Sequence, residues 1–172
     1  MIINFYPEQD NSKFEKAAKE YKRIWEKEGD AIAEAIEKVS GLKFREKIIN
    51  AIIYMDVSYS IPLKLQADIP IEHKKGVLVH ELCHRIVVGN NIAVKTEETR
   101  DARNRDIHKH IDLILYDVWV ELYGENFAKN EIDFEINLWS GKGISPYKIA
   151  WDWALSMMKE ERQKLWKKSL KK

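Results

Sequence analysis

The feature that most constrains this chain is the motif His-Glu-Leu-Cys-His at 80–84, which lies inside an apolar stretch. A proline near the start of that stretch and a glycine after its end predict a helix over 70–88. On a helical period the imidazoles of His80 and His84 lie one turn apart on one face, where both reach one ion. Glu81 lies beside them, where its carboxylate can contact a coordinated water without binding the ion itself. The motif therefore predicts a zinc site on this helix.

Helical patterns occur on both sides of the motif. Residues 12–28 and 30–40 carry apolar side chains at three- and four-residue spacing, which predicts two packing helices that separate at Gly29. The segment 107–125 is apolar nearly all round, which indicates a largely buried helix. A last helix is expected from Pro146 onward, because proline is favoured in the first helical turn. The chain is thus expected to have additional helices at both ends.

Strand signals are confined to two regions. β-branched and aromatic residues predict strands at 46–55 and 60–66, which we expect to form a hairpin. Pro62 cannot donate a ladder hydrogen bond, so the second strand is expected at a sheet edge. Strict alternation over 131–138 predicts a further strand or an extended arm. An extended arm that lies in an active-site cleft would keep an enzyme latent, as a zymogen is.

Composition narrows the class of protein. The 172 residues are 45% hydrophobic, enough for a core, and predict one α+β domain over 1–172. The net charge of +1 gives no reason to expect nucleic acid as the main partner, and no apolar run approaches the roughly 18 residues that span a membrane. A single cysteine and the lack of a secretory signal indicate a cytoplasmic protein.

A catalytic zinc needs a third protein ligand and an open position for water. Asp117 and Glu121 lie four residues apart on the apolar helix at 107–125, where buried carboxylates are costly unless they are paired or bind an ion. We expect Glu121 to be the third ligand and Asp117 to accept a hydrogen bond from a ligand histidine. Two alternatives stay open: the reverse assignment, and an acidic pair bonded to a core tyrosine or arginine.

The zinc motif and the downstream glutamate together resemble the gluzincin branch of the zincin metallopeptidases, and the chain is similar to the small soluble minigluzincins over 60–125. The resemblance implies a small, mostly antiparallel sheet above a cleft, an active-site helix, and a buried helix that carries Glu121. It also implies that the strand at 60–66 binds an extended peptide by strand addition. The commoner gluzincin pattern has an acidic partner four residues after the ligand glutamate, whereas Asp117 comes four residues before it.

These residues predict a zinc-dependent endopeptidase that acts on extended peptides. Zinc lowers the pKa of a coordinated water and polarises the scissile carbonyl, while Glu81 takes the water proton and delivers it to the leaving amine. The alternatives are a zinc-containing binding or regulatory protein with little turnover, a latent zymogen, and a hydrolase of a non-peptide amide. The sequence does not choose among four candidates for stabilising the oxyanion, which are His108, His110, Tyr116 and Tyr123.

Overall fold

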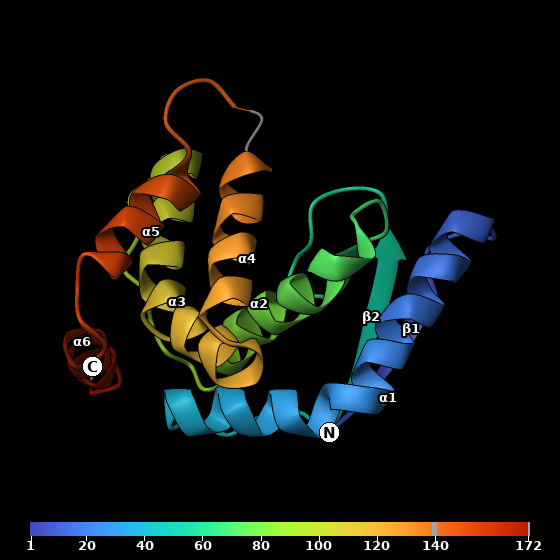
Figure 1. The fold of residues 1–172 in the computed structure, drawn as a ribbon, viewed down its shortest axis with the longest axis horizontal. Coiled ribbons are helices and arrows are strands. Elements are labelled where there is room, and N and C mark those ends of the chain that lie inside the picture. Colours follow the sequence, from blue (N-terminus) through green and yellow to red (C-terminus); the bar gives the residue numbers. More distant parts are fainter. Residues whose placement is uncertain (139–140, 172) are drawn as a thin grey trace. The chain divides into compact units, whose positions relative to one another are not determined.

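The computed structural model describes residues 1–138 and 141–171, and it shows an α+β chain that is mostly helical. The chain forms two compact units, Met1–Asn90 and Asn91–Lys172, which are described separately below. The first unit contains β1 (Ile2–Pro7), α1 (Ser12–Ser40), β2 (Ile48–Tyr54), β3 (Lys64–Gln66) and α2 (Ile71–Gly89). The second unit contains α3 (Arg100–Tyr123), α4 (Glu125–Asn137), α5 (Pro146–Leu155) and α6 (Lys159–Ser169) (Figure 1). The expectation of a single domain over 1–172 stays a prediction.

The sheet of the first unit is parallel, so the prediction of a mostly antiparallel sheet with a hairpin is wrong. Its strands are ordered β1-β2-β3, with Ile3 beside Ile49 and Ile53 beside Leu65. These four residues are buried and alternate along their strands with more exposed ones. Parallel neighbours need a crossover connection, which α1 supplies between β1 and β2. The prediction that the strand after Pro62 lies at an edge of this sheet is confirmed.

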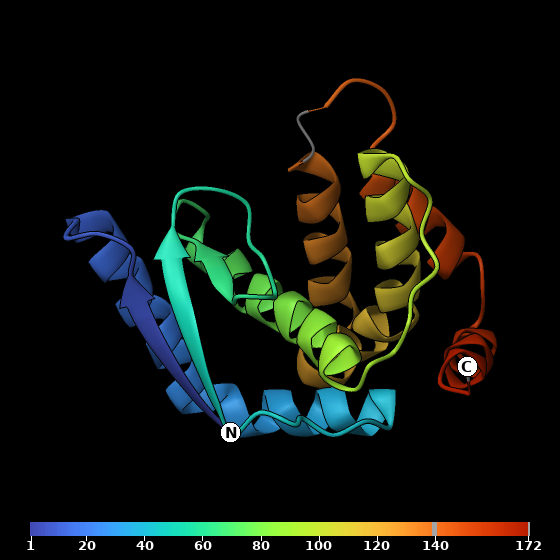
Figure 2. The same cartoon turned by 180° about the vertical axis from the view of Figure 1, so that it is seen from behind.

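The two helices predicted at 12–28 and 30–40 are one helix, α1, and it bends within its length (Figures 1 and 2). Gly29 therefore lies inside the helix, where glycine costs about 1 kcal/mol relative to alanine. A Cβ atom at this position would come within 2.8 Å of the Trp25 ring, so close packing explains the glycine. Gly41 ends α1 in the left-handed conformation, with φ of 69°.

The predicted helix at 70–88 is α2, which begins after Pro70 and is confirmed. Its own side chains are buried on several of its sides. These buried residues are Leu78, Val79, Leu82, Cys83, Ile86 and Val87. Lys74 anchors the start of α2, because its buried Nζ donates to the carbonyl oxygens of Ala67 at 2.8 Å and Ile69 at 3.3 Å and pairs with Glu20 at 3.3 Å. The backbone that carries the motif at 80–84 is therefore held on more than one side.

The second unit is helical throughout its regular elements, and the prediction of a strand or extended arm at 131–138 is wrong. That segment lies in α4, where Ala128 and Ile132 are both buried one turn apart. The short alternating run also contains apolar pairs four residues apart, so its pattern fits a helix as well as a strand. Because α4 is helical, this segment is not an extended arm, and it gives no support to the hypothesis of a latent enzyme. The single last helix predicted after Ser145 is two helices, α5 and α6.

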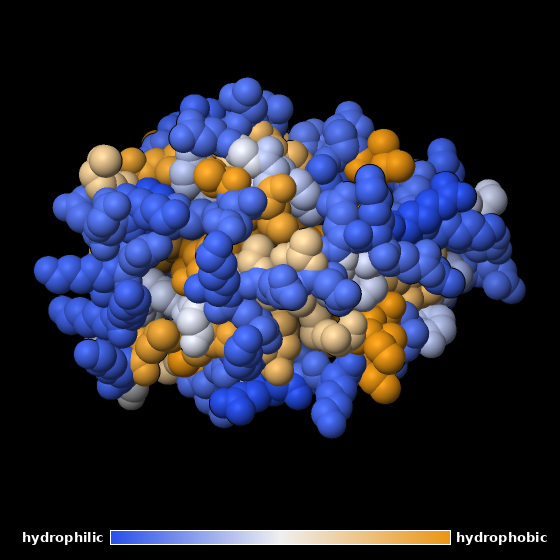
Figure 3. All heavy atoms as spheres, turned by 60° about the horizontal axis from the view of Figure 1, so that its bottom comes forward, coloured by the Kyte–Doolittle hydropathy of each residue, from blue (hydrophilic) through white to orange (hydrophobic). Residues whose placement is uncertain are grey.

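On the face drawn in Figure 3, hydrophilic residues predominate and hydrophobic ones gather in small patches between them. Among residues 1–138 and 141–171, no helix combines the length and apolar composition that crossing a membrane requires.

Candidate metal centre

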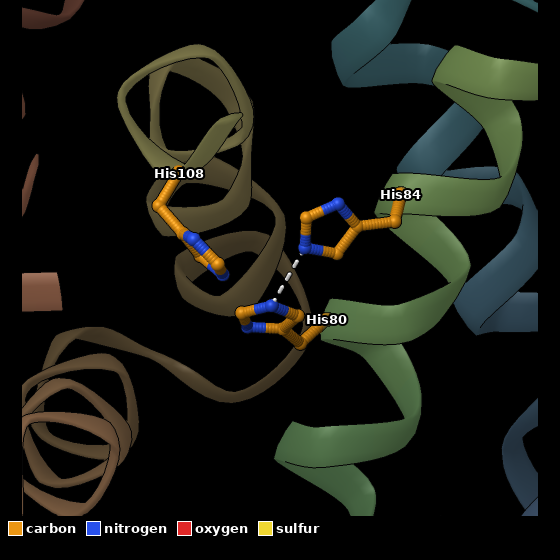
Figure 4. Close-up of side chains that lie close together, drawn as sticks. All are labelled: His80, His84 and His108. Carbon is orange, nitrogen blue, oxygen red and sulfur yellow. Dashed lines mark hydrogen bonds between the residues drawn. The ribbon is translucent and has the colours of Figure 1, made fainter. Parts of the chain in front are cut away.

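Helix α2 brings His80 and His84 together. Their Nε2 atoms are 2.9 Å apart, their ring centroids are 4.8 Å apart, and Figure 4 shows the two rings turned toward one another. His80 is buried and His84 is half-buried. The packing of α2 fixes both backbone positions, so the pair is preformed.

The geometry of this pair fits a metal ion. Two nitrogens bound at 2.0–2.1 Å to a tetrahedral zinc lie about 3.3 Å apart. The 2.9 Å between the two Nε2 atoms is close to this separation. Imidazole is also a common zinc ligand. The first unit therefore supplies two imidazole nitrogens at a separation that an ion could bridge, and in the metal-free protein one ring donates a hydrogen bond to the other.

Glu81 is buried beside this pair, and its charge acts on two phenols. Burial raises the pKa of Tyr21 well above its usual value, and the charge of Glu81 raises it further. Burial also raises the pKa of Tyr54, as do the neighbouring Tyr59 and Asp56 and then Glu81. Both phenols donate to backbone carbonyls elsewhere in the first unit: Tyr21 to Gln66 at 3.0 Å and Tyr54 to Val57. The two tyrosines therefore stay neutral near neutral pH.

Arg85 follows the second histidine directly and ties α2 to the rest of the first unit. Its guanidinium makes a bidentate ion pair with Glu46, with Nε 3.1 Å from Oε2 and Nη2 on Oε1, and Nη1 donates to the carbonyl oxygen of Ser60. Charge-assisted, two-pronged bonds of this kind are among the stronger ones in proteins. The bonds to Glu46 and Ser60 hold the segments before β2 and before β3 against the C-terminal half of α2.

Helix α3 carries a third histidine with the chemistry of a metal ligand. His108 is buried, its Nδ1 lies 2.7 Å from the carbonyl oxygen of Asn104, and its ring packs 4.4 Å from that of Tyr147. A carbonyl only accepts, so Nδ1 carries the proton and Nε2 carries the lone pair of the neutral ring. Metal-binding histidines are commonly held in this way. His108 is therefore a candidate metal ligand within the second unit.

Asp117 is buried and bonded to a core arginine, one of the alternatives that the sequence left open. Its Oδ1 accepts from Nη2 of Arg162 at 2.6 Å, and both side chains are buried. Its Oδ2 has no hydrogen-bond partner among the residues that the structure describes. The role of Asp117 as an acceptor for a ligand histidine stays a prediction.

Glu121 is exposed on α3, so the argument that a buried carboxylate needs an ion does not apply to it. His108 and Glu121 lie on one helix with about 20 Å of rise between them, so they cannot bind the same ion. Glu121 as third ligand stays a prediction, and His108 is a competing candidate that the sequence did not assign to the metal.

The sequence did not identify Asp112, which lies one turn after His108 in the most apolar part of α3. It is fully buried, and neither carboxylate oxygen has a hydrogen-bond partner in the described part of the chain. Burial raises the pKa of Asp112 well above its usual value, and the charge of Glu135 raises it further. Glu135 itself accepts a 2.9 Å hydrogen bond from Nε1 of Trp151. The sequence did contain a signal for Asp112, because it is an aspartate in an apolar run, four residues after a histidine.

We expect Asp112→Asn to stabilise the metal-free protein near neutral pH. Below the unfolded pKa, about 3.9, the carboxyl is neutral in both states and has no ionisation cost. Above it the unfolded chain releases the proton while the folded chain holds it, so stability falls until the pH passes the raised pKa. Urea unfolding should show the variant gaining stability relative to wild type as the pH rises from 4.5 to 7.5, by about 1.4 kcal/mol for each pH unit over which only the folded carboxyl keeps its proton. Parallel pH profiles would contradict this.

The remaining oxyanion candidates take part in packing within the second unit. The ring of His110 lies 5.0 Å from that of Trp166, and burial lowers its pKa. The Arg162 guanidinium lies 5.2 Å from the ring of Tyr116, and Tyr123 packs 4.5 Å from Phe127. These contacts do not select an oxyanion-stabilising residue.

Comparisons of this chain with protein-family models, with curated proteins and with solved structures find no match. The resemblance to gluzincins therefore rests on the motif residues alone, and a zincin fold is an expectation that the parallel sheet does not establish.

Proposed function

We propose that this protein is a zinc-dependent endopeptidase whose metal centre is built on His80 and His84. The observation that carries the proposal is the convergence of their two Nε2 atoms, 2.9 Å apart on a firmly packed helix, with Glu81 as the neighbouring carboxylate. A purely structural zinc would call for four protein ligands. The zinc motif instead combines two ligands with a carboxylate suited to proton transfer.

The third ligand in this proposal comes from α3. The sequence argues for Glu121, but two features of the second unit favour His108: it is buried, and the Asn104 carbonyl fixes its Nδ1 so that Nε2 carries the lone pair. Asp112, one turn further along α3, is a carboxylate suited to accept the ring N–H of a ligand histidine. That role would give a partner to one of its two buried oxygens, neither of which has one among the described residues.

The zinc ion and the side chains of the protein would have separate roles in the reaction. A bound divalent zinc would lower the pKa of a coordinated water and polarise the scissile carbonyl. Glu81 accepts the proton of the attacking water and returns it to the leaving amine. The hydroxyls of Tyr21 and Tyr54 stay protonated and donate hydrogen bonds to backbone carbonyls. They therefore do not exchange protons with Glu81 near neutral pH. The carboxylate of Glu81 therefore holds the proton between the two steps.

The substrate is proposed to bind as an extended chain. β3 lies at the edge of the sheet in the first unit, and it precedes α2 in the sequence. An extended peptide could pair with this edge through main-chain hydrogen bonds once it displaces the bonds that Lys64 makes to Tyr59 and that the Gln66 N–H makes to Ser58 Oγ. Unfolded segments of polypeptide meet this requirement, whereas folded domains do not expose such a strand. Cleavage of unfolded casein by the zinc-loaded protein tests the activity, and bound zinc without cleavage would indicate a binding or regulatory protein instead.

The choice of third ligand has a direct test. We expect His108→Ala to weaken zinc binding at least about 100-fold, since losing even a residue that supports a ligand costs 10- to 100-fold. Glu121→Ala should change zinc affinity by less than about twofold, because that side chain is exposed. Competition with a chromophoric chelator measures both. The opposite pattern would restore Glu121 as the ligand, and two unchanged affinities would remove α3 from the centre.

A further inference from the structure

Alternate residues of β3 direct their backbone groups to opposite sides. Toward β2, the N–H of Ala67, just after β3, donates to the carbonyl of Tyr54 at 2.7 Å. The backbone groups of Lys64 and Gln66 therefore face away from the sheet. Of these, the Gln66 carbonyl accepts from the Tyr21 hydroxyl of α1 at 3.0 Å. An incoming strand would need the other three groups, which are the N–H and carbonyl of Lys64 and the N–H of Gln66.

These three groups are all bonded to one segment, residues 56–60, called here the strap. Tyr59 and Lys64 form an antiparallel bridge with two backbone hydrogen bonds of 2.8 Å. Ser58 Oγ accepts from the Gln66 N–H at 3.0 Å. The strap thus makes hydrogen bonds to the outer edge of β3 where a bound peptide would make them. The chain therefore occupies the peptide edge itself.

The strap covers little of the core. Val57 is 42% exposed and Tyr59 51%, whereas Leu65 in β3 is fully buried. Segments with few buried apolar contacts and exposed hydrogen bonds open locally, without global unfolding. The strap can therefore leave the edge while β3 stays paired with β2.

The two ends of the strap are held from within the first unit. The Tyr54 hydroxyl donates to the carbonyl of Val57, and Nη1 of Arg85 donates to the carbonyl of Ser60. Arg85 is buried on α2 and also pairs with a glutamate, so the bond at Ser60 is the firmer of the two. Ser60 is thus the pivot, and residues 57–59 are the part that moves.

We propose that the strap is an autoinhibitory gate, which closes the edge of β3 in the free protein and swings away when an extended peptide pairs there. This inference rests on the proposed function, because the gated edge is the one proposed to bind substrate. The peptide replaces the bonds that Lys64 and Gln66 give up, so their backbone groups stay paired. A folded segment has no free main-chain groups to offer in exchange, so the gate admits only extended chains.

A reversible covalent lock tests the gate. Tyr59→Cys/Lys64→Cys places two cysteines directly opposite one another in the antiparallel bridge, where a disulfide can form. In zinc-loaded Glu81→Gln protein, which should bind peptide without cleaving it, the anisotropy of a fluorescein-labelled casein peptide is read before and after reduction with a phosphine. We expect the reduced form to bind at least about tenfold more tightly than the oxidised form, because only the reduced form can open. The zinc content should be equal in the two forms.

Hydrogen exchange tests the gate without a peptide. In wild type, the amides of Lys64 and Gln66, which bond to the strap, should have protection factors at least about tenfold lower than that of Ala67, which bonds to β2. Ser58→Ala should lower the protection of Gln66 by at least about twofold more, since it removes one bond of the strap. The matched control, Ser12→Ala at an exposed serine of α1, should leave it unchanged.

Each outcome decides the proposal. Equal peptide affinity in the oxidised and reduced forms, or equal protection on the two sides of β3, would overturn the gate. Failure of both forms to bind would remove the peptide edge and the gate together. Binding that depends on reduction supports the gate even where wild type fails to cleave casein, and that failure counts against the peptidase alone.

Discussion

Glu81→Gln should keep its bound zinc and lose at least about 100-fold of its peptide cleavage, the lower end of what general acid–base catalysis contributes. Glutamine has nearly the same shape, so the buried position on α2 is preserved. Its amide cannot accept the proton of an attacking water, so a loss in kcat with little change in substrate binding is expected. Hydrolysis of a quenched fluorescent peptide, with the zinc content measured on the same sample, reports both quantities.

Glu72→Gln is the matched control, because Glu72 is an exposed glutamate in the first turn of the same helix. It should retain wild-type cleavage and zinc. Equal cleavage by Glu81→Gln and wild type would remove Glu81 as the base. Loss of zinc from Glu81→Gln would mean that Glu81 binds the ion, which contradicts the division of roles proposed here.

His84→Ala should abolish stoichiometric zinc binding, because it removes one of two nitrogen atoms that already converge. Zinc that binds only the folded state stabilises it by about 2.7 kcal/mol at 100 times the dissociation constant. Wild type should therefore unfold at a higher temperature with added zinc, and His84→Ala should not respond. Thermal unfolding with and without zinc, together with chelator competition, measures the effect.

His73→Ala is the control for this substitution. His73 is a half-buried histidine on α2, two turns before the motif, and about 10 Å of rise separates it from His80. It should bind zinc as wild type does. A response to zinc that is lost equally in both variants would show that the ion binds elsewhere on the helix.

Local signals in the sequence predicted the elements that they directly encode. The proline and glycine that bound α2 and the proline before β3 act on the backbone at their own positions, so the helix and the edge strand were predicted correctly. The α1 crossover makes β1 and β2 parallel, and β2 and β3 are also parallel across the short connection between them; the alternation of apolar residues encodes neither direction. The short alternating run at 131–138 fits two periods, and packing in the second unit selects the helix.

In the candidate site, too, the residues that follow from local sequence were predicted, and those that depend on tertiary structure were not. His80, Glu81 and His84 were identified because their geometry follows from one helical turn. The partner of Asp117 was left open, since Arg162 lies far along the chain and only tertiary structure brings the two together. Asp112 was missed because an aspartate among apolar residues gives no sign of whether its oxygens find partners. Its burial is a property of the folded second unit.

The central claim is that the histidines of α2 hold a zinc ion that keeps a position for solvent. X-ray absorption at the zinc edge of the purified protein, with and without acetohydroxamate, tests it most directly. The account predicts nitrogen and oxygen neighbours at about 2.0–2.1 Å, at least two imidazoles, and a spectrum that changes when the hydroxamate displaces solvent. A protein that retains no zinc, a sulfur neighbour at about 2.3 Å from Cys83, or a spectrum unchanged by the hydroxamate would contradict it.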